Sequence, residues 1–297
     1  MPLTATASVT VIWLFRALGG LPLWLNHGIG FAMGWLAWLG SNRHRRLTRD
    51  NVGQFARHTQ ATDATQLLHA AISEQGKSIS ELAAAWTASP ERLYSLVREC
   101  VGWALVEAAQ VARQPIIFVT PHLGCYDIAG RYLAGKMQIT ALYSPPKQAW
   151  LASIMQQGRA RAGGATAAAD ASGIRALLRT LKRGGNIVLL PDQVPGGGDG
   201  VWVDFFGRPA YTMTLLPRLA ASANAVVLFF FAERLPHGAG YRVHIESMAE
   251  PFSTDRKIAA LQTNYMVEKL IAMAPAQYLW GYNRYKHPAG APLPGTR

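Results

Sequence analysis

The sequence predicts an α/β protein in which helices flank a mainly parallel sheet, preceded by an N-terminal helical segment that associates with a membrane. Two observations carry this prediction. From residue 115 onward, short runs of β-branched and aromatic residues alternate with stretches of helical periodicity, a pattern typical of strand–helix–strand units. Near the N-terminus, a stretch without formal charge carries several tryptophans, as segments at a membrane interface do.

Composition limits the classes of function that the chain can have. Of the 297 residues, 50% are hydrophobic and 15% are charged, which excludes a disordered chain and leaves ample material for a core. Lys and Arg number 29 against 17 Asp and Glu, a formal net charge of +12. This excess favours an anionic partner: a nucleic acid, an anionic membrane surface, or an acidic substrate or carrier.

The N-terminal segment has no formally charged residue between Arg16 and Arg43. Trp24, Trp35 and Trp38 suit a membrane interface, and the segment reaches the roughly 20 residues that a spanning helix needs. Glycines, a proline and an asparagine interrupt it, so the sequence leaves open whether it spans a bilayer or lies flat in the interface. Two buried helices of a soluble core are the alternative.

A basic run directly after this segment predicts the orientation of the chain. Positive charge next to a membrane segment favours the cytoplasmic side, so we expect the rest of the chain there. The sequence thus divides into a membrane-associating segment, residues 1–42, and one larger domain, residues 43–297.

Five runs are expected to form strands. Residues 116–120 (IIFVT) and 186–190 (NIVLL) are nearly continuous apolar runs, each followed by a proline, as in strands buried on both faces. The run AVVLFFF has the same character. The complete set of expected strands is 116–120, 139–143, 186–190, 225–231 and 241–246.

Helical periodicity is clearest in residues 172–183. Apolar side chains recur there at Ile174, Leu177, Leu178 and Leu181, and a Gly-Gly pair follows. Residues 47–113 are expected to be mainly helical and to pack beside the sheet. The other expected helices are 125–134, 149–161, 212–223 and 255–273.

The strongest chemical motif follows the IIFVT strand. Open α/β sheets place their sites at the carboxyl ends of strands, where His122 lies. A turn at Gly124 lets the next helix begin, so Asp127 falls near its first turn and can fold back to a ring nitrogen of His122. That contact would fix the tautomer of the ring and leave the other nitrogen as a general base. A helix-capping or core histidine is the alternative.

Three further residues are candidates for the same site. Arg159 and Arg161 lie where a helix ends in Gly163-Gly164, and neighbouring guanidinium groups suit phosphate or carboxylate. Asp192 ends the NIVLL strand and should lie at the same sheet edge as His122. A solvated helix end and a turn or capping aspartate are the respective alternatives.

Other motifs do not indicate a nucleotide-binding loop, a metal site or a cysteine nucleophile. Gly76-Lys77-Ser78 resembles the end of a phosphate-binding loop, but it lacks the required earlier glycine and follows no strand. The two cysteines, Cys100 and Cys125, show no C-x-x-C spacing, which indicates a reducing compartment and no metal site. Cys125 is interpreted as a packing residue rather than a nucleophile.

The motif around His122 resembles a known signature. His122-x-x-x-x-Asp127 is similar to the H-x-x-x-x-[DE] motif of the lysophospholipid acyltransferase superfamily. The wider resemblance is to the late acyltransferases of lipid A biosynthesis, the lauroyl and myristoyl transferases, and it covers nearly the whole chain. The matching stretches are GKSISELAAAW (76–86), VTPHLGCYDIAG (119–130), GRARAGG (158–164), GIRALLRTLKRGGNIVLLPDQVPG (173–196), VWVDFFGRPAYTMT (201–214) and APAQYLWGYNRYKHP (274–288).

The resemblance implies an acyltransferase-like fold and an O-acyltransferase activity. A fatty acyl chain would pass from acyl carrier protein, or acyl-CoA, to a hydroxyl of a lipid A precursor at the cytoplasmic face of the inner membrane. His122 would be the general base, without a covalent acyl-enzyme, and Asp127 would orient its ring. Arg159 and Arg161 would bind anionic groups, and Asp192 would be a further site residue. No metal and no cofactor is implied.

Three alternatives remain beside this hypothesis. Members that act on lipid A often carry Glu where this chain has Asp127, and Asp is usual in the glycerolipid branch, so a glycerolipid or another glycolipid is the alternative acceptor. A nucleic-acid-binding protein is disfavoured because the basic residues are scattered and match no such motif. An inactive membrane adaptor is disfavoured because the His122/Asp127 pair is intact.

Overall fold

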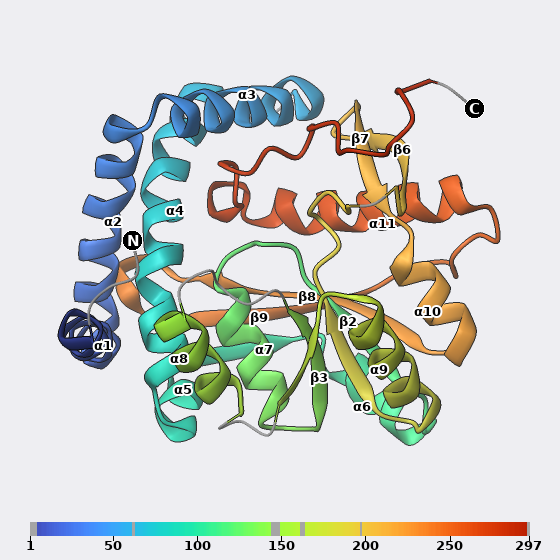
Figure 1. The fold of residues 1–297 in the computed structure, drawn as a ribbon, viewed down its shortest axis with the longest axis horizontal. Coiled ribbons are helices and arrows are strands. Elements are labelled where there is room, and N and C mark those ends of the chain that lie inside the picture. Colours follow the sequence, from blue (N-terminus) through green and yellow to red (C-terminus); the bar gives the residue numbers. More distant parts are fainter. Residues whose placement is uncertain (1–4, 61–62, 144–148, 161–163, 197, 296–297) are drawn as a thin grey trace.

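The computed structural model describes residues 5–60, 63–143, 149–160, 164–196 and 198–295. Its centre is a seven-stranded sheet with the strand order β1-β9-β8-β2-β5-β3-β4. Neighbouring strands are parallel except β8 and β9, which are antiparallel, so the predicted mainly parallel sheet is confirmed (Figure 1). The strands are β1 (Val97–Val101), β2 (Ile116–Val119), β3 (Ile139–Tyr143), β4 (Ala165–Ala168), β5 (Asn186–Leu189), β8 (Val226–Arg234) and β9 (Tyr241–Ser247).

Helices cover both faces of this sheet, because its strands are apolar on both sides. In β2, Ile116 and Phe118 belong to a core formed with α6 (Trp103–Val111), α7 (Tyr126–Ala134) and α8 (Ala149–Ala160). Ile117 and Val119 point to the opposite core. The helices on that side are α9 (Ala171–Lys182), α10 (Leu215–Ala223) and α11 (Arg256–Met273). This alternation along one strand accounts for the three-layer arrangement.

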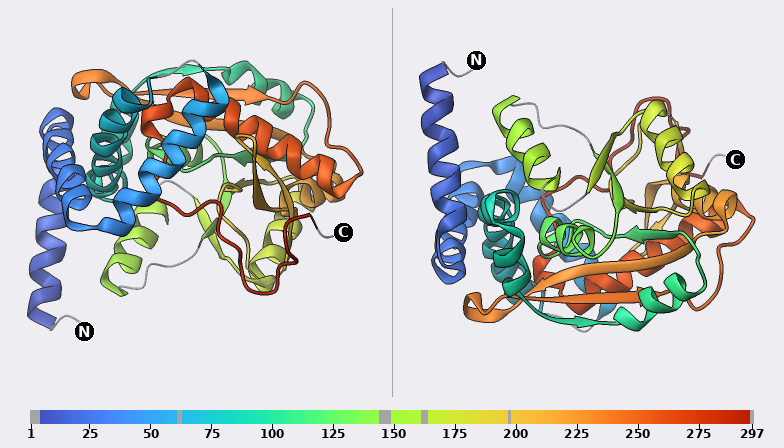
Figure 2. Two further views of the ribbon diagram at one scale, coloured as in Figure 1. Left: turned by 90° about the horizontal axis from the view of Figure 1, so that it is seen from above. Right: turned by 90° about the horizontal axis from the view of Figure 1, so that it is seen from below.

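The N-terminal third of the chain forms a helical layer beside the sheet. It consists of α1 (Ala5–Gly20), α2 (Leu23–Gly40), α3 (Asn42–Thr59), α4 (Ala64–Thr87) and the short α5 (Pro90–Leu96). Figure 2 shows α1 and α2 along one edge of the molecule. α2 packs closely on α4 because both carry glycine at the contact: a Cβ on Gly34 would collide with the carbonyl of Ile72, and one on Gly76 with the backbone of α2.

The outer face of α1 and α2 exposes large apolar side chains. We call this set the apolar face; its members are Trp13, Leu14, Trp24, Ile29, Phe31, Leu36 and Leu39. In the described part of the chain, no helix combines the length and the apolar character that crossing a membrane requires.

Several predicted elements need correction. The helix expected over 212–223 begins at Leu215, because residues before it form β7 (Arg208–Met213), paired in a hairpin with β6 (Gly200–Phe205). β1 lies within the region expected to be mainly helical, and its charged sequence VRECV forms an edge strand beside β9. β4 is an alanine-rich run that is a strand through its pairing with β3. The remaining predicted strands and helices agree with the structure within one to three residues at their ends.

Candidate active site

Two neighbouring parallel strands bring the central pair of the site together. β2 pairs with β5, and His122 and Asp192 follow the ends of these strands by the same number of residues. The Asp192 Oδ1 atom lies 2.8 Å from Nδ1 of His122, and its Oδ2 accepts a 2.9 Å hydrogen bond from the His122 backbone N–H. One carboxylate thus fixes both the ring and the backbone of the histidine.

The partners of the His122 ring define its tautomer. A carboxylate only accepts hydrogen bonds, so the proton of the neutral ring lies on Nδ1, toward Asp192. The Nε2 atom is then the acceptor, and the side-chain amide of Gln193 lies 3.2 Å from it. A neutral imidazole with its lone pair on Nε2 is the form that a general base requires.

The environment of Asp192 keeps it ionised. Burial by itself would raise the pKa of this carboxyl, but the charge of His122 and the hydrogen bonds from its ring and backbone outweigh burial and hold the pKa below its usual value. The Tyr278 hydroxyl hydrogen-bonds to the same carboxylate, and the nearby Arg284 guanidinium contributes favourable charge. Asp192 therefore provides a fixed negative charge next to the imidazole, which stabilises an imidazolium when the ring takes a proton.

The loop that carries His122 is held by a C-terminal segment, residues 274–285. The Leu279 N–H donates to the carbonyl of His122, and the Gly124 N–H donates to the carbonyl of Gln277. The Gln277 side chain in turn accepts from the N–H of Arg234 and donates to its carbonyl. Gly124 has a φ of +57°, and a Cβ there would meet the carbonyl of Ala232, so the turn needs glycine.

A cavity of about 780 Å³ opens in front of His122. Its wall includes Tyr126, whose ring lies edge-on to the imidazole with centroids 5.0 Å apart, and Gln193. It extends from α4 and α8 to α9 and α10, where Ile174, Leu215 and Arg218 line it. Most of the remaining wall is apolar: Leu82, Trp86, Leu142, Leu151, Met155, Leu189, Leu190, Val194 and Met213.

A second cavity reaches His122 from the opposite direction. It has a volume of about 240 Å³ and lies between α2 and α4, with Ala37, Ile79 and Leu82 on its wall. His122, Tyr126 and Leu82 line both cavities. Two approaches, one from the side of α2 and one from the side of α9 and α10, therefore meet at the same imidazole.

The structure brings together some of the sequence-predicted site residues. Asp127 lies in the first turn of α7, is buried, and lines the large cavity with His122. The carboxylate expected from Asp127 at the His122 ring nitrogen is found on Asp192, and the role of Asp127 stays a prediction. Arg159 belongs to α8, but its side chain, like the whole of Arg161, lies outside the described residues.

The remaining sequence interpretations concern residues to which no catalytic or ligand-binding role was assigned. Cys125 is buried, and burial with the nearby charge of Glu81 raises the pKa of its thiol well above the usual value, so the packing interpretation holds. Gly76-Lys77-Ser78 lies inside α4 and forms no loop. Across the described ranges, no group of three or more His, Cys, Asp or Glu side chains is arranged to hold a metal ion.

Sequence reasoning missed four residues of the site. Tyr126 and Gln193 contact the His122 ring, and Tyr278 and Arg284 surround Asp192. Arg284 is buried and donates to the carbonyl of Tyr211, so it is part of the interior rather than the cavity wall. The PDQ and WGYNRYK stretches contain two of these four, Gln193 and Arg284, and were the available signal, but no spacing rule links them to His122.

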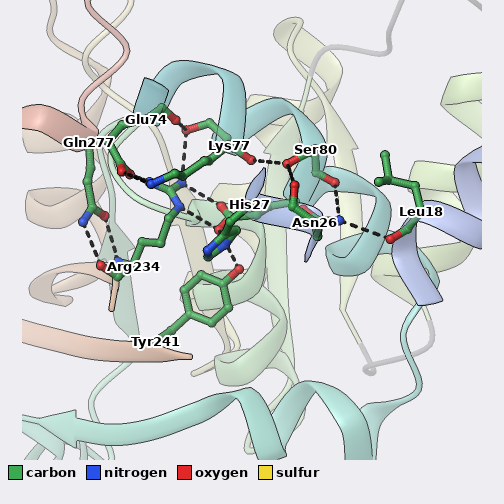
Figure 3. Close-up of polar contacts among 11 residues, drawn as sticks. Leu18, Asn26, His27, Glu74, Lys77, Ser80, Arg234, Tyr241 and Gln277 are labelled. Atoms are coloured by element: carbon green, nitrogen blue, oxygen red, sulfur yellow. Dashed lines mark hydrogen bonds and ion pairs between the residues drawn. The ribbon is translucent and has the colours of Figure 1, made fainter. Parts of the chain in front are cut away.

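A second histidine–carboxylate pair lies at the junction of α2, α4 and the sheet. Nε2 of His27 lies 2.5 Å from Glu81, which also accepts hydrogen bonds from Arg234 and from the Tyr241 hydroxyl (Figure 3). Arg234 further contacts Glu74. Burial would raise the pKa of Glu81, but the charge of Arg234 and these hydrogen bonds lower it to about 2.

Comparisons with known proteins point to one family. The family model described as bacterial lipid A biosynthesis acyltransferase matches residues 1–287. The lipid A biosynthesis lauroyltransferase of Escherichia coli (strain K12) is 24% identical over 96% of this chain and 92% of its own length. The lipid A biosynthesis palmitoleoyltransferase of the same organism is 26% identical over 92% of this chain and 91% of its own length. A lipid A biosynthesis acyltransferase of Haemophilus influenzae (strain ATCC 51907 / DSM 11121 / KW20 / Rd) is 31% identical over 61% of this chain and 57% of its own length.

Proposed function

Because the chain belongs to the bacterial lipid A biosynthesis acyltransferase family, it is an acyl-transferring enzyme, and we propose that it acylates a hydroxyl of a lipid A precursor. The donor is a fatty acyl thioester, carried by acyl carrier protein or by CoA. The observation that carries the proposal is the His122–Asp192 pair, with Nε2 of the imidazole facing a large, mostly apolar cavity. The names of the similar proteins specify different acyl groups, lauroyl and palmitoleoyl, so the acyl chain length is determined by the assay below.

The proposed reaction needs no covalent acyl-enzyme. Nε2 of His122 takes the proton of the acceptor hydroxyl as its oxygen attacks the thioester carbonyl, displacing the Gln193 amide from the ring. The tetrahedral oxyanion then collapses, the C–S bond breaks, and the imidazolium returns its proton to the leaving thiolate. Asp192 holds Nδ1–H throughout and stabilises the imidazolium between these steps.

Three residues have roles that the contacts do not define. We keep Asp127 in the site because it lines the same cavity as His122. Arg159 and Arg161 remain candidates for the anionic groups of the acceptor or the donor, as phosphate recognition by guanidinium groups suggests.

We propose that the enzyme works at the cytoplasmic face of the inner membrane. The apolar face of α1 and α2 would contact the lipid, with the cations at the start of α3 at the headgroups. The cavity between α2 and α4 leads from that side to His122, which gives a lipid acceptor a route to the base.

A reconstituted assay tests the proposal. Purified protein in detergent would receive lauroyl- or myristoyl-carrier protein, or the matching acyl-CoA, with a tetra-acylated lipid A precursor. Mass spectrometry of the lipid should show a gain of one acyl chain, and His122→Gln should abolish it. Transfer to a lysoglycerolipid in place of the lipid A precursor would keep the mechanism and overturn the acceptor.

One variant of each acid separates their roles. Asp192→Asn should lose most of the rate because it removes the carboxylate on Nδ1. Asp127→Glu keeps a carboxylate at position 127 and should keep measurable activity. A rate loss in Asp127→Glu without one in Asp192→Asn would reassign the orienting role to Asp127.

A further inference from the structure

A row of cations follows the solvent side of α9 and α10. Arg175, Arg179 and Lys182 recur at helical spacing and are exposed, Arg183 follows at the end of α9, and Arg218 is exposed on α10. We call these five residues the basic stripe. Neither helix contains Asp or Glu, and within the described chain none of the five pairs with a carboxylate within 4.0 Å.

The basic stripe lies at one mouth of the large cavity. α9 and α10 pack side by side, and Ile174, Leu215 and Arg218 line the cavity that ends at His122. Arg218 therefore belongs both to the exposed stripe and to the entrance. Two acids lie beside the stripe: Asp170, which caps α9 and interacts electrostatically with Arg175, and the exposed Asp199, which lines the cavity. The five cations outnumber these two carboxylates, so the surface keeps a net positive charge.

The basic stripe faces away from the apolar face. In all three views, α9 and α10 lie on the opposite side of the molecule from α1 and α2 (Figures 1 and 2). A bilayer in contact with the apolar face would leave α9 and α10 open to solvent. The stripe is then available to a soluble partner rather than to lipid headgroups.

Resting on the proposed function, we infer that the basic stripe is the docking surface for the acyl donor, an acidic carrier protein. Complementary charge would steer the carrier to α9 and α10 and set its orientation, and its thioester arm would enter the cavity past Arg218 toward His122. The acceptor approaches from the α2 side, so the two substrates reach the imidazole through different openings.

A pair of matched charge-reversal variants tests this inference. Arg175→Glu/Arg179→Glu/Lys182→Glu reverses the stripe and leaves Arg218 in place. The control, Arg43→Glu/Arg46→Glu/Arg49→Glu, makes the same change in net charge at three exposed positions of α3. Binding of fluorescently labelled lauroyl-carrier protein would be followed by anisotropy, and turnover would be measured with lauroyl-carrier protein and with neutral lauroyl-pantetheine.

We expect the stripe variant to weaken carrier binding and to raise KM for the carrier by about tenfold at low salt, with kcat within about twofold. High salt should shrink the difference, and kcat/KM for lauroyl-pantetheine should be unchanged. The α3 control should bind the carrier like the wild type and should lose affinity for phosphatidylglycerol vesicles instead.

Several outcomes would overturn the docking surface. They are unchanged carrier affinity in the stripe variant, an equal loss in the α3 control, or a loss of vesicle binding in place of carrier binding. A wild-type protein that uses acyl-CoA and does not bind the carrier would also overturn it. Carrier binding that depends on the stripe without any lipid A product would instead keep the docking surface and reject the proposed acceptor.

Discussion

Two histidine–carboxylate pairs in this protein have similar contacts and opposite surroundings. His27 and Glu81 are joined at 2.5 Å, with side chains 7% and 0% exposed, while His122 and Asp192 are joined at 2.8 Å, with side chains 16% and 2% exposed. Glu81 is also compensated by Arg234 and Tyr241, whereas the His122 ring lines a cavity of about 780 Å³.

The difference shows what turns such a pair into a candidate base. The Glu81 charge is satisfied by a guanidinium and a hydroxyl, and the cluster joins α2 and α4 to β8 and β9 (Figure 3). Asp192 also has a hydroxyl and a guanidinium nearby, those of Tyr278 and Arg284, but the imidazole that it holds has its other nitrogen beside the cavity. The first arrangement stabilises the fold, and the second leaves a proton acceptor within reach of substrate. The predictions below test this separation of stability from activity.

Replacing His122 should have the largest effect on activity. We expect His122→Gln to lower kcat by about a thousandfold or more, because the general base is removed, while the melting temperature stays within about 3 °C. Acyl transfer and thermal unfolding of the same preparation measure both. Near-normal turnover by this variant would reject His122 as the base.

Asp192→Asn should reduce kcat by about a hundredfold or more, because an amide can donate to Nδ1 and favour the wrong tautomer. The measurement is turnover at saturating donor, with binding of the labelled carrier protein as a control that should not change. Full activity would show that the ring is oriented by another group, and Asp127 would be tested next.

Glu81→Gln should act on stability rather than on chemistry. Removing one partner of the buried Glu81–Arg234 pair should cost about 3 kcal/mol of unfolding free energy, measured by urea denaturation. Folded protein at low temperature should keep kcat within about fivefold, since the cluster does not touch the reacting atoms. A kcat loss as large as that of His122→Gln in folded protein would contradict the separation.

The pH dependence of stability gives a smaller effect with a defined sign. The pKa of Glu81 is about 2 in the folded protein, below the value of about 4.3 usual for unfolded chains. Its stabilising contribution is therefore complete above the unfolded pKa and is lost as the pH falls from there through about 2. The difference in melting temperature between the wild type and Glu81→Gln should stay constant from pH 6 to about 5 and shrink as the pH is lowered further toward 3. Parallel curves over this lower range would contradict the linkage.

The smallest effect is expected for His27→Gln. A glutamine amide can still donate to Glu81, so the loss should be about 1 kcal/mol, with activity retained. Urea denaturation of His27→Gln and Glu81→Gln under the same conditions compares their unfolding free energies. A loss of unfolding free energy equal to that of Glu81→Gln would show that the imidazole, rather than Arg234, makes the main stabilising contact with Glu81.

Much of the fold and part of the site followed from local patterns. The apolar runs of β2, β5 and β8 and the periodicity of α9 are strong local signals, and each corresponds to the observed element. β1 and β4 gave no such signal, because a charged run and an alanine-rich run become strands through their neighbours. The start of α10 was predicted too early for a related reason, since the preceding residues pair with β6.

The sequence by itself determined the class of fold, the positions of His122, Asp127 and Asp192 near strand ends, and the resemblance to a family of acyltransferases. Only the tertiary structure decided which carboxylate holds the imidazole. The sequence favoured Asp127 because it is close along the chain, but the pairing of β2 with β5 brings Asp192 to Nδ1 across 70 positions. A strand pairing is a contact between distant segments, and local spacing carries no information about which side chains it places within hydrogen-bond distance.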